Sequence, residues 1–389
     1  MAALSEGRFV GGAVRNALSG WPVGEIDIAV PMPPEETLRR LEIAAIKAVP
    51  TGLEHGTITA IVNGHPFEIT SLRRDVETDG RHATVVFTDD WEEDAARRDF
   101  TMNALYATVD GEIFDFHGGV QDLIAGRVRF VGDPRERIRE DYLRILRLFR
   151  FHAWYGKGDM DPEALRAAAD AKAGLARLSG ERIAKEMLRL LECQNPAPAL
   201  RLMAASGVLP EILPYALQLT RLEHLVLIEV ENHLAPDPLL RLAALLPDDV
   251  AVAIAVGERL KLSGAERARL EGLAGSGEKI PAYLSASDVR RLLYRVGASR
   301  FRDRVLVSWA AGPRGASQIQ WRMLLSIADG WERPRFPLTG RDAIAAGVVE
   351  GPEVGRILAA LEAWWLAEDF MPDETALREK LNSLIETGA

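Results

Sequence analysis

The sequence has 389 residues, of which 48% are hydrophobic and 27% are charged, and its formal net charge is −10. This is the composition of a globular protein, so it excludes disorder as the dominant state. Because a single hydrophobic core rarely grows beyond about 300 residues, the length predicts more than one domain. The acidic balance argues against a protein that coats nucleic acid nonspecifically, but it allows a local basic groove.

Signals for membranes, secretion and disulfides are weak. No apolar run approaches the roughly 20 residues of a membrane-spanning helix, and the first residues lack the basic and apolar segments of a secretory signal. The single cysteine, Cys193, excludes a disulfide scaffold and a cysteine-based zinc site within one chain. We therefore expect a cytoplasmic protein with no membrane partner.

The first fifty residues predict strand, glycine turn, helix, strand and helix. Residues 8–10 form a short apolar run, Gly11-Gly12 interrupts it, and residues 13–18 have helical character. Residues 25–30 alternate polar and apolar side chains, which is the period of a half-buried strand. Residues 35–48 have the pattern of an amphipathic helix.

The next segment predicts a hairpin, because Asn63-Gly64 separates apolar runs at residues 57–62 and 66–70. Beyond it we expect a mobile polar loop at 73–83, a helix at 89–107, a strand at 112–115 and a helix at 136–154. Strand signals fade after Val131, and the remaining sequence is rich in Ala, Leu and Arg between Pro and Gly breaks. The outline is a small head with strands followed by a long helical body.

The glycine turn is the first candidate site. Gly11-Gly12 before a helix would present free backbone N–H groups and the positive end of the helix dipole, which together can cradle a phosphate. Arg15, in the first turn, could pair with a phosphate oxygen. The alternative is a tight turn with no ligand.

Two carboxylates on the following strand form the second candidate. Glu25 and Asp27 are two residues apart, so both would point to the same face. Neighbouring carboxylates repel unless a cation lies between them, and Mg²⁺ takes oxygen ligands while keeping waters and substrate phosphates. Glu68, on a later strand, could supply a third carboxylate. The alternative is a solvent-facing strand edge.

Arginines are concentrated between residues 127 and 150, which contain eight arginines and four acids. Asp141 and Arg144 are three residues apart, so they would be neighbours on a helix and could offer acceptors beside donors to a base edge. Arg147 and Arg150 could neutralise a triphosphate. Upstream, Arg98 could form a surface pair with its neighbour Asp99. The alternative for all of these is a solvated helix face.

In this order, the motifs resemble those of the class II CCA-adding tRNA nucleotidyltransferases and bacterial poly(A) polymerases, a branch of the polymerase-β-like superfamily. The matching stretches are GGAVRNALSG (11–20), EIDIA (25–29), FEITSLRRD (67–75), RRDFTMNALY (97–106), DFHGGVQDLIAGRVRFVGDPRERIREDYLRILR (115–147), ERIAKEML (181–188) and, more weakly, GVVEGPEVGRILAALEAWW (347–365).

The resemblance implies an α+β head, a small mixed sheet with flanking helices, followed by an all-α body and tail. It implies a catalytic head at 1–130, nucleotide-selecting and RNA-binding helices at 131–215, and a tRNA-binding body and tail at 216–389. The implied activity is addition of CCA to tRNA 3′ ends from CTP and ATP. The implied partner is tRNA, and no obligate protein partner is evident.

The resemblance also implies a role for each matching position. Mg²⁺ would be held by Glu25 and Asp27, and the residues near the nucleotide would be Gly12, Arg15, Arg98, Asp141, Arg144, Arg147 and Arg150. Of these, Asp141 and Arg144 would pair with the base. The loop at 73–83 would correspond to the flexible loop linked to the switch from CTP to ATP. In the helical body, the best candidates for RNA backbone contact are Arg290, Arg291, Arg295, Arg300, Arg302 and Arg304.

Two positions depart from the family pattern, which usually has Asp where this chain has Asn16 and Glu25. The first departure removes a charge, and the second lengthens a metal-binding arm by one methylene. The motifs do not separate CCA addition from poly(A) or A-only addition. The two departures also leave open a noncatalytic RNA-binding relative.

Overall fold

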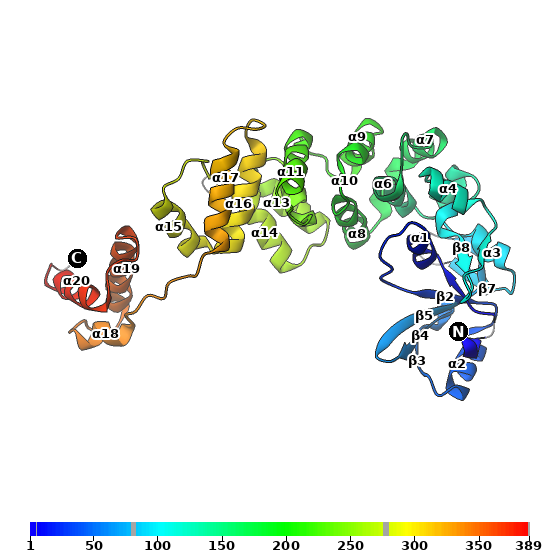
Figure 1. Cartoon of the computed structure of the whole chain (residues 1–389), viewed down its shortest axis with the longest axis horizontal. Helices are drawn as coiled ribbons and strands as arrows, with labels where there is room; N and C mark the ends of the chain where they lie inside the picture. The colour runs from blue at the N-terminus through cyan, green and yellow to red at the C-terminus, as the bar shows by residue number, and fades with distance from the viewer. Residues whose placement is uncertain (5, 79–82, 275–279, 388–389) are drawn as a thin grey trace. The chain divides into compact units, whose positions relative to one another are not determined.

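The structure is a computed structural model that describes residues 1–4, 6–78, 83–274 and 280–387 (Figure 1). The chain divides into two compact units. Unit 1 comprises residues 1–219, 235–247 and 251–267, and unit 2 comprises residues 220–234, 248–250 and 268–389. The described strands all belong to unit 1, whereas the described part of unit 2 is helical.

A seven-stranded mixed sheet forms the head of unit 1. Its order is β3-β4-β5-β2-β1-β8-β9; β2 and β5 run parallel, and the other neighbouring pairs are antiparallel. β6 and β7 form a separate antiparallel pair. The strands are β1 (Arg8–Val10), β2 (Asp27–Val30), β3 (Lys47–Gly52), β4 (Thr57–Val62), β5 (His65–Ser71), β6 (Arg73–Thr78), β7 (Ala83–Phe87), β8 (Leu105–Ala107) and β9 (Ile113–Asp115).

Strand β2 is central to the head because both of its faces are buried. Ile28 and Val30 pack into one hydrophobic cluster, and Ala29 packs into another on the opposite face. Since side chains alternate along a strand, Asp27 points to the same face as Ala29. The sheet therefore places Asp27 at the beginning of a rigid, buried strand.

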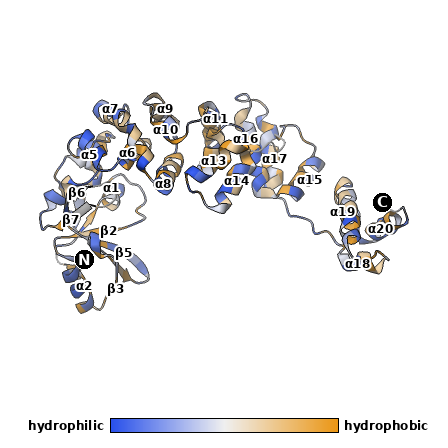
Figure 2. Cartoon of the chain, turned by 180° about the vertical axis from the view of Figure 1, so that it is seen from behind, coloured by the Kyte–Doolittle hydropathy of each residue, from blue (hydrophilic) through white to orange (hydrophobic). Residues whose placement is uncertain are grey.

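Helices complete unit 1. Those beside the sheet and those that follow it are α1 (Gly12–Leu18), α2 (Pro34–Ile43), α3 (Trp91–Ala96), α4 (Gly119–Ala125), α5 (Pro134–Glu140), α6 (Leu143–Tyr155), α7 (Pro162–Ala171), α8 (Gly180–Leu191), α9 (Ala197–Ala205), α10 (Val208–Ile212), α12 (Pro238–Leu245) and α13 (Val250–Arg259). Short 3₁₀ helices are η1 (Ala2–Leu4), η2 (Leu53–His55), η3 (Thr101–Asn103) and η4 (Lys172–Arg177). Along individual helices, hydrophobic residues alternate with hydrophilic ones (Figure 2), as expected where one face is buried.

Unit 2 contains the helices α11 (Leu219–Glu231), α14 (Gly264–Ala274), α15 (Ala286–Val296), α16 (Ala298–Ala311), α17 (Gln318–Asp329), α18 (Gly340–Ala345), α19 (Pro352–Ala367) and α20 (Glu374–Thr387), the first two of which begin in unit 1. One core cluster of this unit gathers Leu338, Leu361, Trp365 and Leu377. In the described part of the chain, no helix is both long and apolar enough to cross a bilayer.

The predicted fold class, an α+β head followed by helices, is confirmed, while the domain boundaries at residues 130 and 215 stay a prediction. The hairpin at Asn63-Gly64 is confirmed as the β4–β5 turn, in which both residues have positive φ. The predicted strand at 25–30 starts later, at Asp27, so Glu25 lies in the preceding loop.

Two predicted helices were too long. The helix expected at 35–48 ends at Ile43, because Ala45 adopts a positive φ and residues 47–52 form the exposed edge strand β3. An edge strand tolerates Pro50, which lacks a donor. The helix expected at 89–107 ends at Ala96, and Leu105–Ala107 instead forms β8, whose side chains are buried in the sheet. Short apolar runs fit either structure, so their pattern alone could not decide.

The predicted loop at 73–83 was also wrong in part. Residues 73–78 and 83–87 pair as β6 and β7, and residues 79–82 lie outside the described residues. The helix expected at 136–154 is broken at Asp141, whose extended backbone (φ −151°, ψ 109°) separates α5 from α6.

The single cysteine lies in the helical part of unit 1. Cys193 is 1% exposed, and burial raises the pKa of its thiol to about 11. A thiol in this environment is protonated at neutral pH and is a poor nucleophile.

Candidate active site

A cavity of about 800 Å³ in unit 1 lies between the sheet and helices α6 and α8. Nine of the ten predicted site residues line it, and the exception is Glu68. The full lining also includes Gly11, Asn16, Pro22, Gly24, Arg97, Asp99, Asn103, Leu143, Phe151, Arg182 and Arg189. Segments far apart in the sequence therefore meet at one site.

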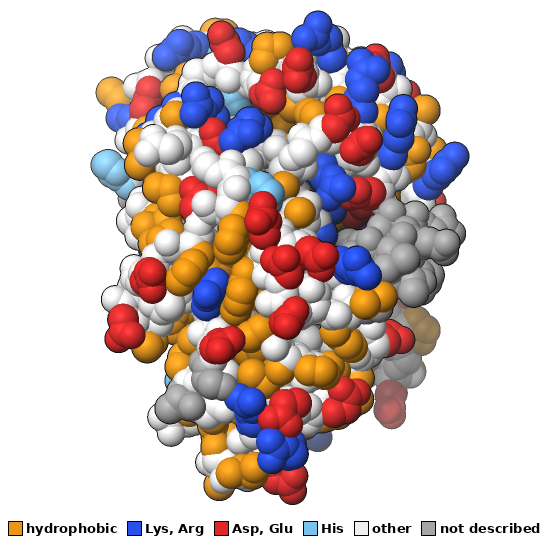
Figure 3. All heavy atoms as spheres, turned by 90° about the vertical axis from the view of Figure 1, so that its right-hand side faces the viewer, with side chains coloured by type: hydrophobic (Ala, Val, Ile, Leu, Met, Phe, Trp, Pro, Cys, Tyr) orange, Lys and Arg blue, Asp and Glu red, His pale blue; other side chains and the backbone are white. Residues whose placement is uncertain are grey.

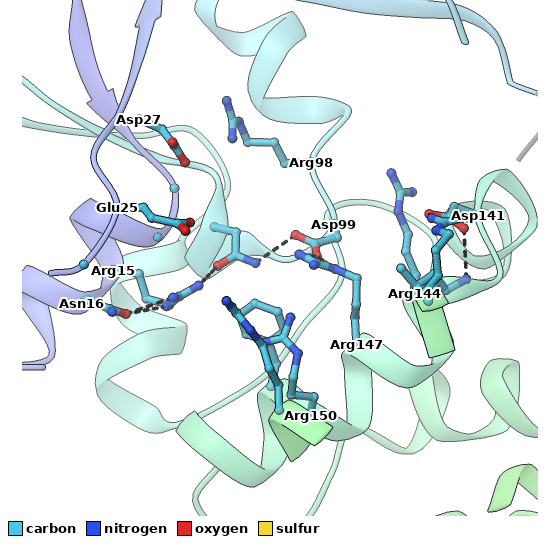
Figure 4. A pocket seen from close by; sticks show the side chains of 18 of the residues that line it. Arg15, Asn16, Glu25, Asp27, Arg98, Asp99, Asp141, Arg144, Arg147 and Arg150 are labelled. Carbon is cyan, nitrogen blue, oxygen red and sulfur yellow. Dashed lines mark hydrogen bonds and ion pairs between the residues drawn. The ribbon is translucent and has the colours of Figure 1, made fainter. Parts of the chain in front are cut away.

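Two carboxylates occupy the head side of the cavity. Glu25 lies in the loop two residues before Asp27, which begins β2, and their side chains lie side by side facing the cavity (Figure 4). In the parallel β2–β5 register, Asp27 is paired with Glu68, which is exposed. Burial raises the pKa of Asp27, and the charges of Glu68 and Glu25 raise it further. The charge of Arg98 lowers the pKa of Asp27 and so offsets part of this effect.

This donor set fits a divalent cation. Among the described residues, no group of three His, Cys, Asp or Glu side chains is arranged to hold a metal. Two carboxylates leave most coordination positions to water and substrate phosphates, which is how Mg²⁺ usually binds in phosphoryl-transfer sites. Burial and the charges of Glu68 and Glu25 raise the pKa of Asp27, and a divalent cation bound between the carboxylates would favour its ionised form.

The glycine turn forms as expected between β1 and α1. Gly11 has φ 66° and ψ −120°, a conformation that side-chain-bearing residues rarely adopt. An added Cβ on Gly11 would lie 3.6 Å from a guanidinium nitrogen of Arg98. Because α1 has only seven residues, a phosphate bound here would depend more on the turn and on Arg15 than on a helix dipole.

Arg15 is buried and held from two sides. Its Nη1 donates to Asn103 Oδ1 at 2.5 Å, and its Nε and Nη2 donate to Asn16 Oδ1 at 3.1 and 2.9 Å. Asn16 Oδ1 also accepts from the Tyr155 hydroxyl at 3.0 Å, while its Nδ2 donates to the Pro22 carbonyl at 3.0 Å. An aspartate could not make this last bond, so the amide at Asn16 ties Arg15 to the loop that leads to Glu25.

Arg98 belongs to a buried network that the sequence analysis missed. Its Nη2 lies 2.9 Å from Asp94 Oδ2, and the Tyr106 hydroxyl donates to the same oxygen at 2.7 Å. Arg97 pairs with Asp94 through the other oxygen, at 2.7 Å. Burial alone would raise the pKa of Asp94, but the positive charges of Arg98 and Arg97 outweigh this effect and lower the pKa to about 2. The sequence signal was the spacing of three and four residues from Asp94 to the two arginines.

A second buried acid holds Arg147. Its Nε donates to Asp99 Oδ2 at 2.7 Å, and Asn103 Nδ2 donates to Asp99 Oδ1 at 2.9 Å. Burial would raise the pKa of Asp99, but Arg147 and these hydrogen bonds lower it to about 2. The expected surface pair of Arg98 with Asp99 is therefore wrong, because each residue has another partner.

The expected pair of Asp141 and Arg144 is also replaced. Arg182 Nη2, on α8, donates to Asp141 Oδ2 at 2.7 Å, whereas Arg144 Nη1 donates to Glu140 Oε2 at 2.5 Å. Both residues line the cavity. The break between α5 and α6 explains the change, because Asp141 no longer shares a helix with Arg144.

Arg150 is held by Glu186 of α8, with Nε donating to Oε2 at 2.5 Å, and its guanidinium lies 4.3 Å from the centre of the Phe151 ring. No role is predicted from sequence for Arg182, Glu186 or Arg189, although the first two lie in the ERIAKEML stretch (181–188). On the face shown in Figure 3, basic and acidic side chains are interspersed. In the cavity, by contrast, eight arginines face four carboxylates.

Comparisons with known proteins agree with this geometry. The Poly A polymerase head domain matches residues 7–129, and the probable RNA and SrmB-binding site of polymerase A matches residues 159–219. The human mitochondrial CCA tRNA nucleotidyltransferase 1 is 36% identical over 383 residues, covering 95% of this chain and 85% of the human protein. The chain belongs to the CCA-adding tRNA nucleotidyltransferase family.

Other members of the CCA-adding family are similar over nearly the whole chain. The CCA-adding enzyme of Latilactobacillus sakei is 30% identical over 375 residues, covering 93% of this chain and 90% of that protein. The crystal structure of the Bacillus stearothermophilus CCA-adding enzyme in complex with CTP superposes with a TM-score of 0.77 at 25% identity, covering 100% of this chain and 96% of that one. Family membership makes the chain a nucleotidyltransferase and implies dependence on a divalent metal.

Proposed function

We propose that this chain adds CCA to tRNA 3′ ends from CTP and ATP, without a nucleic-acid template, with Mg²⁺ as its metal. One observation carries the proposal. A single cavity combines two adjacent carboxylates, a glycine turn with a fixed arginine, and an acid–arginine pair at a helix break. Nucleotidyl transfer needs these three functions together: activation of the 3′-hydroxyl, grip on a triphosphate, and choice of base.

The residues of the chain divide these tasks. Glu25 and Asp27 would hold the ions and orient the α-phosphate, and Arg15 and Arg150 would neutralise the phosphates. Asp141 and Arg182 would present an acceptor beside donors to the base edge, as discrimination between cytosine and adenine requires. The bound metal would lower the pKa of the RNA 3′-hydroxyl and neutralise the leaving pyrophosphate. Catalysis would then rest mainly on positioning and electrostatics.

Glu68 has a different role in this proposal. It is exposed and lies outside the cavity lining, but its pairing with Asp27 keeps a negative charge beside the metal ligands. We propose that Glu68 strengthens cation binding from a neighbouring strand rather than contacting the nucleotide.

Incubation of the enzyme with tRNA that lacks CCA and with labelled CTP or ATP tests the proposal. We expect two cytidines and one adenosine per tRNA in Mg²⁺ and none in a chelator. Incorporation of adenosine alone would identify an A-adding enzyme or a poly(A) polymerase instead. Failure to incorporate either nucleotide, with Mg²⁺ or with Mn²⁺, would identify a noncatalytic relative.

The two departures from the family pattern fit activity. The side-chain oxygen of Asn16 accepts hydrogen bonds and its side-chain nitrogen donates one. Glu25 faces the cavity beside Asp27. A cytoplasmic location remains part of the proposal, supported by the single reduced cysteine. Fractionation of cells that express the chain checks it, because the human relative carries a mitochondrial name.

A further inference from the structure

Arg189, on α8, stands apart from the other arginines of the cavity. Each of the other seven has a carboxylate or amide partner: Arg15, Arg97, Arg98, Arg144, Arg147, Arg150 and Arg182. Among the described residues, the guanidinium of Arg189 has no such partner, and the residue is exposed at the cavity. It is therefore a full positive charge available to a ligand.

The position of Arg189 follows from three contacts between α8 and the segment 141–154. Arg182 donates a hydrogen bond to Asp141, and Glu186 accepts one from Arg150. The Arg189 carbonyl accepts a hydrogen bond from Trp154 Nε1 at 2.7 Å. The order of contacts is the same along both segments, so they run alongside each other in parallel. Arg182 and Arg189 are seven residues apart, which is about two turns and roughly 10 Å on the same face of the helix.

The two ends of this pair of helices differ in chemistry. At one end, Arg182 holds Asp141, the proposed base-reading residue. At the other end, Tyr155 bonds Asn16, and Asn16 bonds Arg15, the proposed phosphate-binding residue. Arg189 lies at this second end, beyond Arg150. A nucleotide whose base reaches Asp141 would direct its phosphates toward Arg189.

We propose that Arg189 binds the terminal phosphate of the incoming nucleoside triphosphate and the pyrophosphate that leaves. The inference rests on the proposed function and adds a residue outside the recognised motifs. Unlike its paired neighbours, Arg189 breaks no internal ion pair when it engages a phosphate. Its contribution to binding is therefore undiminished by competition with an acid of the protein.

Equilibrium binding of CTP and CMP in Mg²⁺ tests the inference, because CMP lacks the two outer phosphates. We expect Arg189→Gln to bind CTP about tenfold more weakly than the wild type does. Its affinity for CMP and for tRNA that lacks the final adenosine should be unchanged, and Arg189→Lys should recover part of the loss. Inhibition by pyrophosphate should weaken in parallel.

The matched control is Arg139→Gln, which removes an exposed arginine of α5 that lines a different hollow of unit 1. It should leave binding of CTP and CMP unchanged. Trp154 donates its hydrogen bond to the backbone carbonyl of Arg189, so Arg189→Gln keeps that bond. An unchanged melting temperature of Arg189→Gln would verify that its fold is intact.

The inference would be overturned if Arg189→Gln lost affinity equally for CTP and CMP, or lost affinity for neither. It would also be overturned if only the affinity for tRNA fell, because Arg189 would then bind an RNA phosphate. A wild type that fails to bind CTP would overturn the proposed function as well. A preference for CTP over CMP that is as large in Arg189→Gln as in the wild type would overturn only the role of Arg189.

Discussion

Arginines of the nucleotide cavity and arginines of unit 2 pair with acids in different ways. In unit 1, three of the acids that pair with cavity arginines are buried: Asp94, Asp99 and Glu186 are 1%, 9% and 5% exposed. In unit 2, Arg269 also pairs with a buried acid, Asp303. Three other arginines of this unit, Arg290, Arg291 and Arg302, pair with Asp369, Asp288 and Asp329, which remain accessible to water. The buried acids fix each guanidinium where it faces a cavity. The exposed pairs are screened by solvent, so they hold their arginines less firmly than buried acids do.

Removal of a metal-binding carboxylate should have the largest effect. Asp27→Asn deletes a ligand without changing shape, and several kcal/mol of lost charge stabilisation corresponds to a decrease of about a thousandfold or more in the rate of nucleotide addition. Single-turnover incorporation of labelled CTP measures this. Residual activity within tenfold of wild type would contradict the assignment of Asp27.

Stability should change in the opposite direction at the same position. Because the pKa of Asp27 is raised in the folded chain, its ionised form costs stability as the pH increases through that pKa. In divalent-free buffer at neutral pH, Asp27→Asn should therefore melt at the wild-type temperature or above it. Addition of Mg²⁺ should raise the melting temperature of the wild type more than that of the variant.

A buried acid should give the next largest effect. Asp99→Ala leaves Arg147 without its main counterion inside the protein, which typically costs about 3–5 kcal/mol of unfolding free energy. Urea denaturation measures the loss. Because Asp99 has a pKa of about 2 when folded, its stabilising effect is complete above the ordinary aspartate pKa and is lost as the pH falls toward 2. As the pH falls toward 2, the unfolding free energy of Asp99→Ala should therefore decrease less than that of the wild type.

A smaller effect is expected where α5 meets α6. An added Cβ on Gly174 would overlap the ring of Tyr142, and Tyr142 directly follows Asp141. Gly174→Ala should cost about 1–3 kcal/mol of unfolding free energy. It should also change the ratio of CTP to ATP incorporation, because a displaced Tyr142 moves Asp141.

The double variant Gly174→Ala/Tyr142→Ala provides the control, because the new methyl group then meets no ring. It should match Tyr142→Ala alone in both stability and nucleotide ratio. Additive effects of the two substitutions would show that Gly174 acts through some other contact.

The smallest effect is expected in unit 2. Arg290 Nε donates to Asp369 Oδ1 at 2.9 Å on a partly exposed surface. Arg290→Gln should lower the free energy of unfolding by less than about 1 kcal/mol, since such pairs are screened by water. Denaturation in low and high salt would measure it. A loss comparable to that of Asp99→Ala would remove the distinction between the two regions.

The sequence was sufficient to predict the head, the helical body and nine residues of the cavity, because these carry local signals. Gly11-Gly12 requires an unusual backbone, and Asn63-Gly64 specifies a hairpin. The partners of the arginines could not be predicted in the same way. Asp141 was assigned to Arg144 by helical spacing, whereas its partner, Arg182, is 41 residues away on another helix. The local pattern predicts helix where β8 forms, because burial in a sheet depends on neighbours that lie elsewhere in the chain.

The inert environment of Cys193 has a practical consequence. A side chain that is inaccessible and remains a neutral thiol near pH 7 should not react with maleimides while the chain is folded. A cysteine introduced at an exposed position of either unit would then be labelled alone, without replacement of the native residue. Fluorophores or crosslinkers placed one at a time could follow where a tRNA contacts each unit during successive additions.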